Sequence, residues 1–182
     1  MTISLRPATA GELRDLAELE VEAGQLFTSV GLHEVATHVP DLAALRDHHE
    51  QGRVWVAEAD GQVAGYIVGE VLDGNAHVEQ VSVAPSYAGR GIGATLIRHV
   101  ESWGRSLGLP ATTLTTFRDV PWNAPYYARL GYVELTIERR APELTATMEH
   151  EASMPGIDAT RRCAMVRPNS TVDRARAASP SA

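Results

Sequence analysis

The chain has 182 residues, of which 44% are hydrophobic, and its formal net charge is −7. This length and composition predict one globular domain with a full core, and no stretch reaches the ~20 apolar residues that a membrane-spanning helix needs. The acidic balance argues against a nucleic-acid surface, and the first residues, MTISLRPATAGELRDL, lack the pattern of a signal peptide, so a cytoplasmic location is expected.

Hydrophobic spacing and turn signals predict an alternation of strands and helices along the chain. A capping box at Thr9 and Glu12 opens the first helix, and Asp60-Gly61 is a tight-turn signal between two strands. The predicted strands are 3–6, 53–58, 63–71, 76–83, 111–117, 132–139 and 161–167. The predicted helices begin at Thr9, continue into a looser segment after Gly24, and then cover 41–50, 91–107, 123–130 and 142–153.

The order of these elements predicts the fold class. The strands up to Val83 follow one another through short turns and form an antiparallel meander, whereas residues 76–117 read as strand, glycine turn, helix and strand, which makes those two strands parallel. We therefore expect an α/β (α+β) domain over residues 1–167, with a mixed, mostly antiparallel, twisted sheet flanked by helices. Residues 168–182, rich in Ser, Ala and Pro, are expected to be a disordered tail.

Gly89-Arg90-Gly91-Ile92-Gly93 joins a predicted strand to a helix N-terminus. Glycines permit positive φ angles and close approach of a ligand, and the first N–H groups of a helix bind anions such as a pyrophosphate. A tight structural turn is the alternative. The P-loop is excluded because the chain has no lysine, and the dinucleotide fingerprint is excluded because Leu96 stands where its third glycine belongs.

The stretch 78–131 resembles the GNAT N-acetyltransferase superfamily. The phrase VSVAPSYAGRGIGATLI is similar to its motif A, and the order of elements over residues 3–167 matches its meander, βαβ unit and closing strands. The resemblance implies the GNAT fold, with acetyl-CoA as co-substrate bound in the central βαβ unit. Ala88 stands where the motif usually has Gln or Arg, which puts that side chain's contribution to phosphate binding in doubt.

The resemblance also implies which residues bind acetyl-CoA. Backbone groups of Val81, Ser82 and Val83 would hold the pantetheine and the thioester carbonyl. The pyrophosphate would be bound by the amides of Gly89, Arg90, Gly91, Ile92, Gly93, Ala94 and Thr95.

FRDVPWNAPYYARLGYVEL is similar to the family's motif B. Tyr127 lies four residues before Gly131, where the family has a tyrosine near the CoA sulfur, and the implied role is a general acid for the departing thiolate. A core tyrosine is the alternative, and Tyr126 next to it is a possible substitute. Asn123 either contacts CoA or only caps the helix that begins with Ala124-Pro125.

Attack on a thioester requires a neutral amine, so a base is useful. Glu79 lies on the strand where family members often place a base, and His77, two residues earlier, is expected on the same face. Either residue, or the pair, could accept the proton. The alternative is that both line a polar face of the sheet.

Two segments, 22–38 and 141–156, correspond to the family's acceptor pocket. The candidates, for which a solvated helix face is the alternative, are Glu22, Phe27, His33, Glu34, Trp122 and Glu149. Carboxylates among them would favour a cationic acceptor. No convincing metal set is present among the histidines, so no metal is expected. Cys163, the single cysteine, is expected to be a buried structural thiol.

The sequence thus predicts an acyltransferase that moves an acetyl group from acetyl-CoA to a primary amine, on a small molecule, by direct attack. The open alternatives are a protein N-terminus or lysine as acceptor, a non-catalytic acyl-CoA-binding module, and an interaction protein with a structural glycine turn. Family members are often dimers, so a homodimer is an expectation from resemblance alone.

Overall fold

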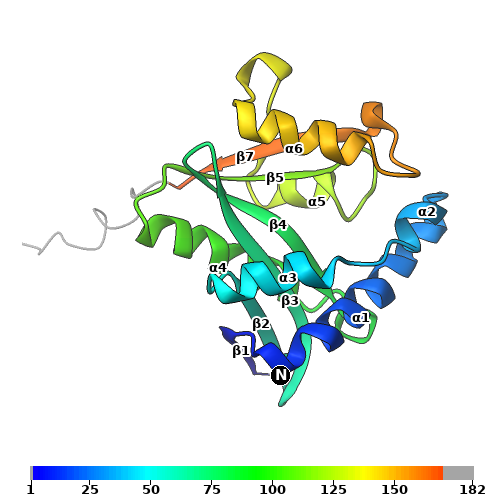
Figure 1. Cartoon of the computed structure of the whole chain (residues 1–182), viewed down its shortest axis with the longest axis vertical. Coiled ribbons are helices and arrows are strands. Elements are labelled where there is room, and N and C mark those ends of the chain that lie inside the picture. The colour runs from blue at the N-terminus through cyan, green and yellow to red at the C-terminus, as the bar shows by residue number, and fades with distance from the viewer. Residues whose placement is uncertain (1, 170–182) are drawn as a thin grey trace, which may run out of the picture.

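The computed structural model, drawn in Figure 1, describes residues 2–169, so residues 170–182 of the predicted tail lie outside the described residues. The strands are β1 (Ile3–Pro7), β2 (Val54–Ala59), β3 (Gln62–Leu72), β4 (Asn75–Val83), β5 (Ala111–Phe117), β6 (Val133–Glu134) and β7 (Arg162–Pro168). The α-helices are α1 (Leu13–Gly24), α2 (His33–Ala36), α3 (Leu42–Glu50), α4 (Ile92–Ser106), α5 (Ala124–Arg129) and α6 (Pro142–Ala152).

The strands form one sheet with the order β1-β2-β3-β4-β5-β7-β6. Only β4 and β5 are parallel among the described strands, and every other neighbouring pair is antiparallel. The predicted α/β class and the mixed, mostly antiparallel sheet are therefore confirmed. None of the helices within residues 2–169 has the length and apolar character to span a membrane.

Helices cover both faces of the sheet (Figure 1). Helix α4 packs through Leu96, Ile97 and Val100 against one face, in the same cluster as Val78 and Leu114 of the two parallel strands. Helices α1 and α3 bury Leu16 and Leu45 against β2 and β3 on the opposite face. Helix α6 lies on that opposite face too, because its Leu144 and Met148 pack on Ala164, whose neighbours Cys163 and Met165 face α4.

Two predicted boundaries are wrong at the C-terminal end. The strand expected over 132–139 is reduced to Val133–Glu134, followed by a 3₁₀ turn over Ile137–Arg139. It pairs only with β7, and Val133 and Ile137 are 58% and 73% exposed, so their alternating pattern does not reflect burial. Pro168 and Asn169, expected in the tail, belong to the fold: Asn169 accepts a 2.9 Å hydrogen bond from Thr112 and donates to the Leu109 carbonyl.

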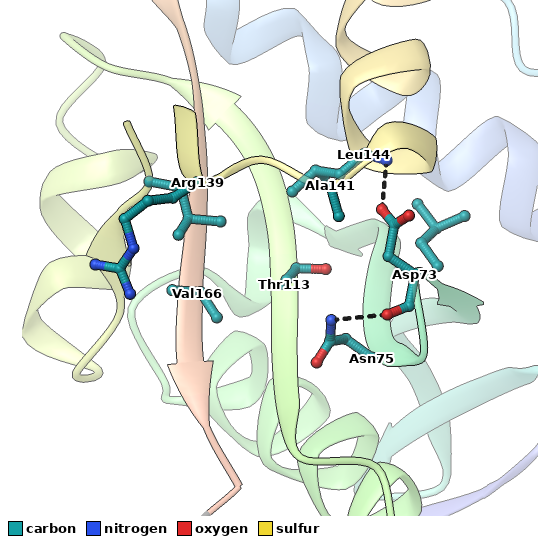
Figure 2. A pocket seen from close by; sticks show the side chains of 9 residues that line it. Asp73, Asn75, Thr113, Arg139, Ala141, Leu144 and Val166 are labelled. Carbon is teal, nitrogen blue, oxygen red and sulfur yellow. Dashed lines mark hydrogen bonds between the residues drawn. The ribbon is translucent and has the colours of Figure 1, made fainter. Parts of the chain in front are cut away.

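The β3–β4 turn is attached to the first turn of α6 (Figure 2). The Asp73 carboxylate accepts hydrogen bonds from the backbone N–H groups of Glu143 (3.0 Å) and Leu144 (2.8 Å), and the Glu143 carboxylate accepts from the Asp73 N–H. Asp73 thus caps α6 from a distant part of the sequence, because the helix has no side-chain cap at Ala141. This contact sets where α6 begins over the sheet.

We expect D73A to destabilise the protein by about 1 kcal/mol more than D60A, the magnitude of a lost helix cap. Asp60 is the matched control because it also precedes a glycine in a two-residue turn, with φ 52° against 50° for Asp73, so both alanines carry the same left-handed strain. For a domain of this size the difference corresponds to roughly 2–4 °C in Tm. Equal midpoints in thermal melts of the two variants would show that the cap contributes nothing.

Candidate active site

The glycine turn presents its backbone as an anion site. Gly89 and Gly91 have φ angles of 74° and 80°, which residues with a side chain adopt only at a cost. Gly91 is the N-cap of α4, so the next N–H groups begin the helix without a partner four residues back. They lie at the positive end of a 15-residue helix. The predicted pyrophosphate contacts thus lie on one continuous turn, and its first N–H groups fit an anion. Two of the predicted amides are already engaged, because the Thr95 N–H donates to the Gly91 carbonyl and the Ala94 N–H interacts with the Tyr126 hydroxyl.

The parallel pairing of β4 with β5 ends early. It covers only three positions, from Ala76–Thr112 to Val78–Leu114, although β4 continues to Val83 and pairs with β3 over that length. The β5-facing backbone groups of the second half of β4 are therefore left without a strand partner. Val81, Ser82 and Val83, the predicted pantetheine contacts, all lie on this unpaired stretch. An amide-containing chain could complete the sheet here.

A β-bulge lies at Glu79. Gln80 pairs with Val68 and Val78 pairs with Gly69, so Glu79 is the extra residue of β4. Bulges redirect side chains and occur next to active sites more often than elsewhere. The bulge follows directly after Val78, the last residue of β4 that pairs with β5. The candidate base thus lies where the two parallel strands stop pairing.

The Glu79 carboxyl lies in an acidic and partly desolvated environment. Its side chain reaches solvent, yet protein surrounds it on most sides, and this desolvation is the main reason why its pKa is raised to about 7. The charges of Glu70 on β3, Glu20 on α1 and Glu151 on α6 raise it further. A carboxyl with a pKa near neutrality can accept a proton at physiological pH and release it again.

His77 occupies a different environment from Glu79. It is 1% exposed, and its Nδ1 lies 2.8 Å from the Thr113 hydroxyl, which itself donates to the Ala76 carbonyl. Desolvation lowers the His77 pKa to about 4. At neutral pH the ring is therefore uncharged, weakly basic and enclosed, which favours Glu79 over His77 as the residue that meets an acceptor.

Tyr127 is partly buried, and its hydroxyl makes no hydrogen bond within residues 2–169. The other four tyrosines have a partner each: Tyr66 with Glu20, Tyr87 with Gln62, Tyr126 with the Ala94 N–H, and Tyr132 with Glu101. Desolvation and Tyr126 raise the pKa of Tyr127 to about 12, while Arg162 acts in the opposite direction. The Tyr127 hydroxyl is therefore protonated at neutral pH and not committed to another side chain.

Tyr126 points to the glycine turn instead. Its hydroxyl interacts with the Ala94 backbone N–H, and a Cβ atom on Gly93 would lie 3.4 Å from the Tyr126 oxygen. The Arg129 guanidinium lies 5.6 Å from the ring centroid, and Arg98 also acts on the hydroxyl. Tyr126 thus contacts the first turn of α4, and the charges of Arg98 and Arg129 act on its hydroxyl.

Asn123 holds the N-cap position of α5 through its backbone alone. Its carbonyl accepts hydrogen bonds from the N–H groups of Tyr126 (2.8 Å) and Tyr127 (3.0 Å), and its side chain makes no capping bond. Asn123 is therefore the N-cap residue of α5, as one of the two alternatives expected, but it caps through its carbonyl and not through its side-chain amide.

The expected acceptor residues fall into two groups. Glu22, His33, Glu34 and Glu149 are exposed, and none of them acts on the Glu79 pKa. Phe27 and Trp122 instead join Phe117 in an aromatic cluster, with ring centroids 5.7 and 5.9 Å from Phe27. The carboxylates that do act on Glu79 are Glu20, Glu70 and Glu151, which the sequence reading missed.

Two of these three carry a signal in the sequence. The two-residue turn Asp73-Gly74 fixes the β3–β4 register, which places Glu70 opposite His77. Glu20 follows the buried Leu13 and Leu16 at helical spacing and is a polar residue on a core-facing stripe. Glu151 has no such signal, because its partner Arg162 on β7 is reached only through the tertiary fold.

Other features lie apart from this region. Cys163 is fully buried, and burial raises the pKa of its thiol to about 11, so the expected structural thiol is confirmed. Within residues 2–169 no three His, Cys, Asp or Glu side chains are arranged to hold a metal ion. A cavity of about 160 Å³ lies under the Asp73 cap (Figure 2). It meets the first residues of β4 at Asn75, not the bulge or the glycine turn.

Comparison with known proteins identifies the family. The model of the acetyltransferase (GNAT) family matches residues 15–132, which include α1, the bulge, the glycine turn and α5. The chain belongs to the GNAT acetyltransferase family. The region 78–131, where the GNAT resemblance was read from motifs, falls inside this match. An uncharacterized N-acetyltransferase of Methanocaldococcus jannaschii is 41% identical over 49 residues, which is 27% of this chain and 31% of that protein.

Solved structures share the GNAT fold. The ribosomal-protein-S18-alanine N-acetyltransferase of Escherichia coli has a TM-score of 0.65 at 18% identity, with 93% of this chain and 95% of that chain covered. The PaiA N-acetyltransferase of Thermoplasma acidophilum, in complex with coenzyme A, gives 0.63 at 16% identity, covering 92% and 99%. N-acetylglutamate synthase of Neisseria gonorrhoeae gives 0.69 at 17% identity, and 93% of this chain covers only 36% of that one.

The Glu79 environment predicts a pH-dependent stability for E79Q. Because the folded state raises this pKa to about 7, the fold favours the protonated carboxyl. The ionised form therefore destabilises the fold progressively as the pH rises from the unfolded value, ~4.3, through 7. We expect E79Q to melt close to wild type at pH 4.5 and above it at pH 8. A wild-type melting temperature that exceeds the variant's at pH 8 would contradict this environment.

Proposed function

We propose that the protein transfers an acetyl group from acetyl-CoA to a primary amine of a small, cationic molecule, with Glu79 as general base and Tyr127 as general acid. The observation that carries the proposal is the arrangement where β4 parts from β5. The exposed Glu79 carboxyl has a raised pKa and follows the last paired residue of β4, and the Tyr127 hydroxyl makes no hydrogen bond within residues 2–169. The charge of Glu151 acts on Glu79 and that of its ion-pair partner Arg162 acts on Tyr127.

Acetyl-CoA would lie along the unpaired half of β4 and end at the glycine turn. The turn supplies backbone donors for the pyrophosphate, and the β5-facing edge of Val81, Ser82 and Val83 supplies donors and acceptors for the amide-containing pantetheine. Two similar structures, those of Thermoplasma acidophilum and Neisseria gonorrhoeae, are described as complexes with coenzyme A, which supports this choice of donor. The thioester supplies the acetyl group.

The two protein side chains would handle the protons. Glu79, ionised above pH 7, would accept a proton from the attacking ammonium, directly or through a water molecule, and leave a neutral nucleophile. Tyr127 stays protonated up to about pH 12 and would give its proton to the departing sulfur. His77, held by Thr113, would support the strand next to the bulge and not receive the proton.

The surroundings of Glu79 favour a cationic acceptor. Glu20, Glu70 and Glu151 come from three different elements, and all three add negative charge around Glu79, which would attract a cationic molecule. A small acceptor is favoured over a polypeptide because the α6–β7 segment touches α2: a Cβ on Gly156 would collide with the Glu34 side chain. This contact would close one side of the acceptor pocket that the family resemblance assigns to segments 22–38 and 141–156.

The first test is thermal unfolding with and without acetyl-CoA, followed by thiol release with a panel of amines. A ligand that binds only the folded state at 100 times its Kd adds about 2.7 kcal/mol, so we expect a midpoint shift of several degrees. Release with diamines and other small cationic amines, and not with peptides, is the expected result. No shift at saturating acetyl-CoA would overturn the proposal, and release with peptides alone would move the acceptor to proteins.

The acid role predicts a kinetic difference between two neighbouring tyrosines. We expect Y127F to lower kcat by about 10²–10⁴-fold while the acetyl-CoA-dependent thermal shift is kept, since general acid catalysis contributes on that order. Y132F is the matched control: its hydroxyl bonds Glu101, which Arg167 also holds, so kcat should remain near wild type. Full activity of Y127F with loss of activity in Y126F would transfer the acid role to Tyr126.

A further inference from the structure

The ion pair Glu151–Arg162 joins the last turn of α6 to the first residue of β7. The Arg162 guanidinium lies 2.7 Å from the Glu151 carboxylate, and the two side chains are only 10% and 20% exposed. By contrast, both side chains of the Arg118–Glu134 pair are more than 40% exposed. The Glu151–Arg162 pair is thus largely removed from water, where charges act on their neighbours most strongly.

Its orientation is fixed by a third residue. The Thr115 hydroxyl donates to Glu151 Oε1 (2.5 Å) and accepts from Arg162 (3.0 Å), while Oε2 of Glu151 accepts from the same guanidinium. The guanidinium carbon also lies 4.8 Å from the centroid of the Phe117 ring. Both carboxylate oxygens are therefore engaged, and neither charge can turn away without breaking a contact.

Stability alone does not explain this pair. A buried ion pair is often no better for stability than apolar residues of the same volume, and the buried Nε–H of Arg162 has no hydrogen-bond partner, which is costly. What distinguishes the pair is its position. Thr115, which holds both charges, directly follows Leu114, the last residue of β5 that pairs with β4, so the pair lies beside the strand divergence and the bulge at Glu79. In agreement with this position, the Glu151 charge raises the pKa of Glu79 and the Arg162 charge lowers that of Tyr127.

We propose, on the basis of the function proposed above, that Glu151 and Arg162 are positioning residues for the acetyl transfer. Thr115 holds the Glu151 carboxylate and the Arg162 guanidinium beside the strand divergence where the base Glu79 lies, so that their opposite charges offset each other there. Because Glu151 lies in the last turn of α6, the proton affinity of the base also depends on where this helix ends. Neither Glu151 nor Arg162 touches the reacting atoms.

Several other groups act on the same two side chains and set the background. Glu79 faces Glu20 from α1 and Glu70 from β3, and it acts in turn on Tyr66 of β3. Tyr127 faces Tyr126 from α5 and the Tyr132 hydroxyl. Arg162 is the one cation that acts on Tyr127, and no cation acts on Glu79, among residues 2–169. Removing one member of the pair therefore leaves the other member's charge uncompensated.

The test compares E151Q with R162Q through the pH dependence of kcat/KM. In E151Q the carboxylate that opposes ionisation of Glu79 is gone, so the acidic limb should move to lower pH. In R162Q the Glu151 carboxylate is no longer offset by a cation and disfavours ionised Glu79, so the acidic limb should move to higher pH. We expect each shift to be about one unit, the lower end of the effect of a neighbouring charge. R162K, which keeps the charge, should restore the wild-type limb.

A purely structural role would give a different result. E151Q and R162Q lose the same contact, so a structural role would lower Tm and activity in both variants while the acidic limb stays in place. That outcome overturns the proposal. A shift of the acidic limb in the same direction in both variants also overturns it. R161Q is the matched control. Arg161 directly precedes Arg162 but pairs with the exposed Asp119, so R161Q should leave the acidic limb unmoved. A failure of the proposed function would give a different result. If Glu79 is not the base, E79Q keeps its activity and its acidic limb, regardless of the results with E151Q and R162Q.

Discussion

The early end of the β4–β5 pairing is the constraint on which the site depends. Parallel strands normally continue their hydrogen bonds for as long as both extend, but here β4 continues to Val83 without β5 after Val78. Backbone groups inside a fold need partners, and on this edge of β4 no strand within residues 2–169 supplies them. The glycine turn at the end of the same strand adds further unpaired N–H groups. A long ligand with amides at one end and phosphates at the other matches both needs.

The bulge in β4 adds a candidate catalytic side chain to this backbone arrangement. An extra residue in β4 directly after the last paired position places the Glu79 carboxyl beside the opening. Tyr127 belongs to the core cluster that packs on the other face of the sheet, where α4 lies. The two candidate proton carriers therefore come from opposite faces, which a continuous β4–β5 ladder would keep apart. Strand divergence is thus a condition for the acid and the base to serve one reaction.

Local patterns predicted much of this fold. The tight turns at Asp60-Gly61 and Asp73-Gly74, the Thr9–Glu12 capping box and the GRGIG turn all lie where the sequence placed them, because each depends on a few adjacent residues. The edge strand after Tyr132 was overestimated, because its alternation of apolar residues does not correspond to burial: Ile137 is largely exposed. Periodicity indicates a strand only where a neighbour covers one face.

The environment of the site could be predicted only in part. Motif spacing led to Glu79, Tyr127 and the glycines, but nothing local indicates that Glu79 is a bulge residue, because a bulge is a property of register with β3. The same limit applies to Glu151 and Arg162, which come from different elements and meet through Thr115 of a third. Motifs in the sequence point to candidate residues, whereas the charges that act on their proton affinities come from tertiary contacts.

Helix α6 connects these observations. Its first turn is capped by Asp73 from the β3–β4 turn, and its last turn is held by Arg162 of β7. The two attachments come from opposite sides of the β4–β5 pair, so α6 cannot shift along the sheet without breaking one of them. A rigid helix is what an electrostatic partner of Glu79 requires, because a carboxylate that moved by a few ångströms would change the base strength from one conformation to the next. The same rigidity narrows the acceptor face where the α6–β7 segment meets Glu34 of α2. In the proposed reaction, the segment between β6 and β7 would therefore influence both the proton affinity of Glu79 and the size of the acceptor that can reach it.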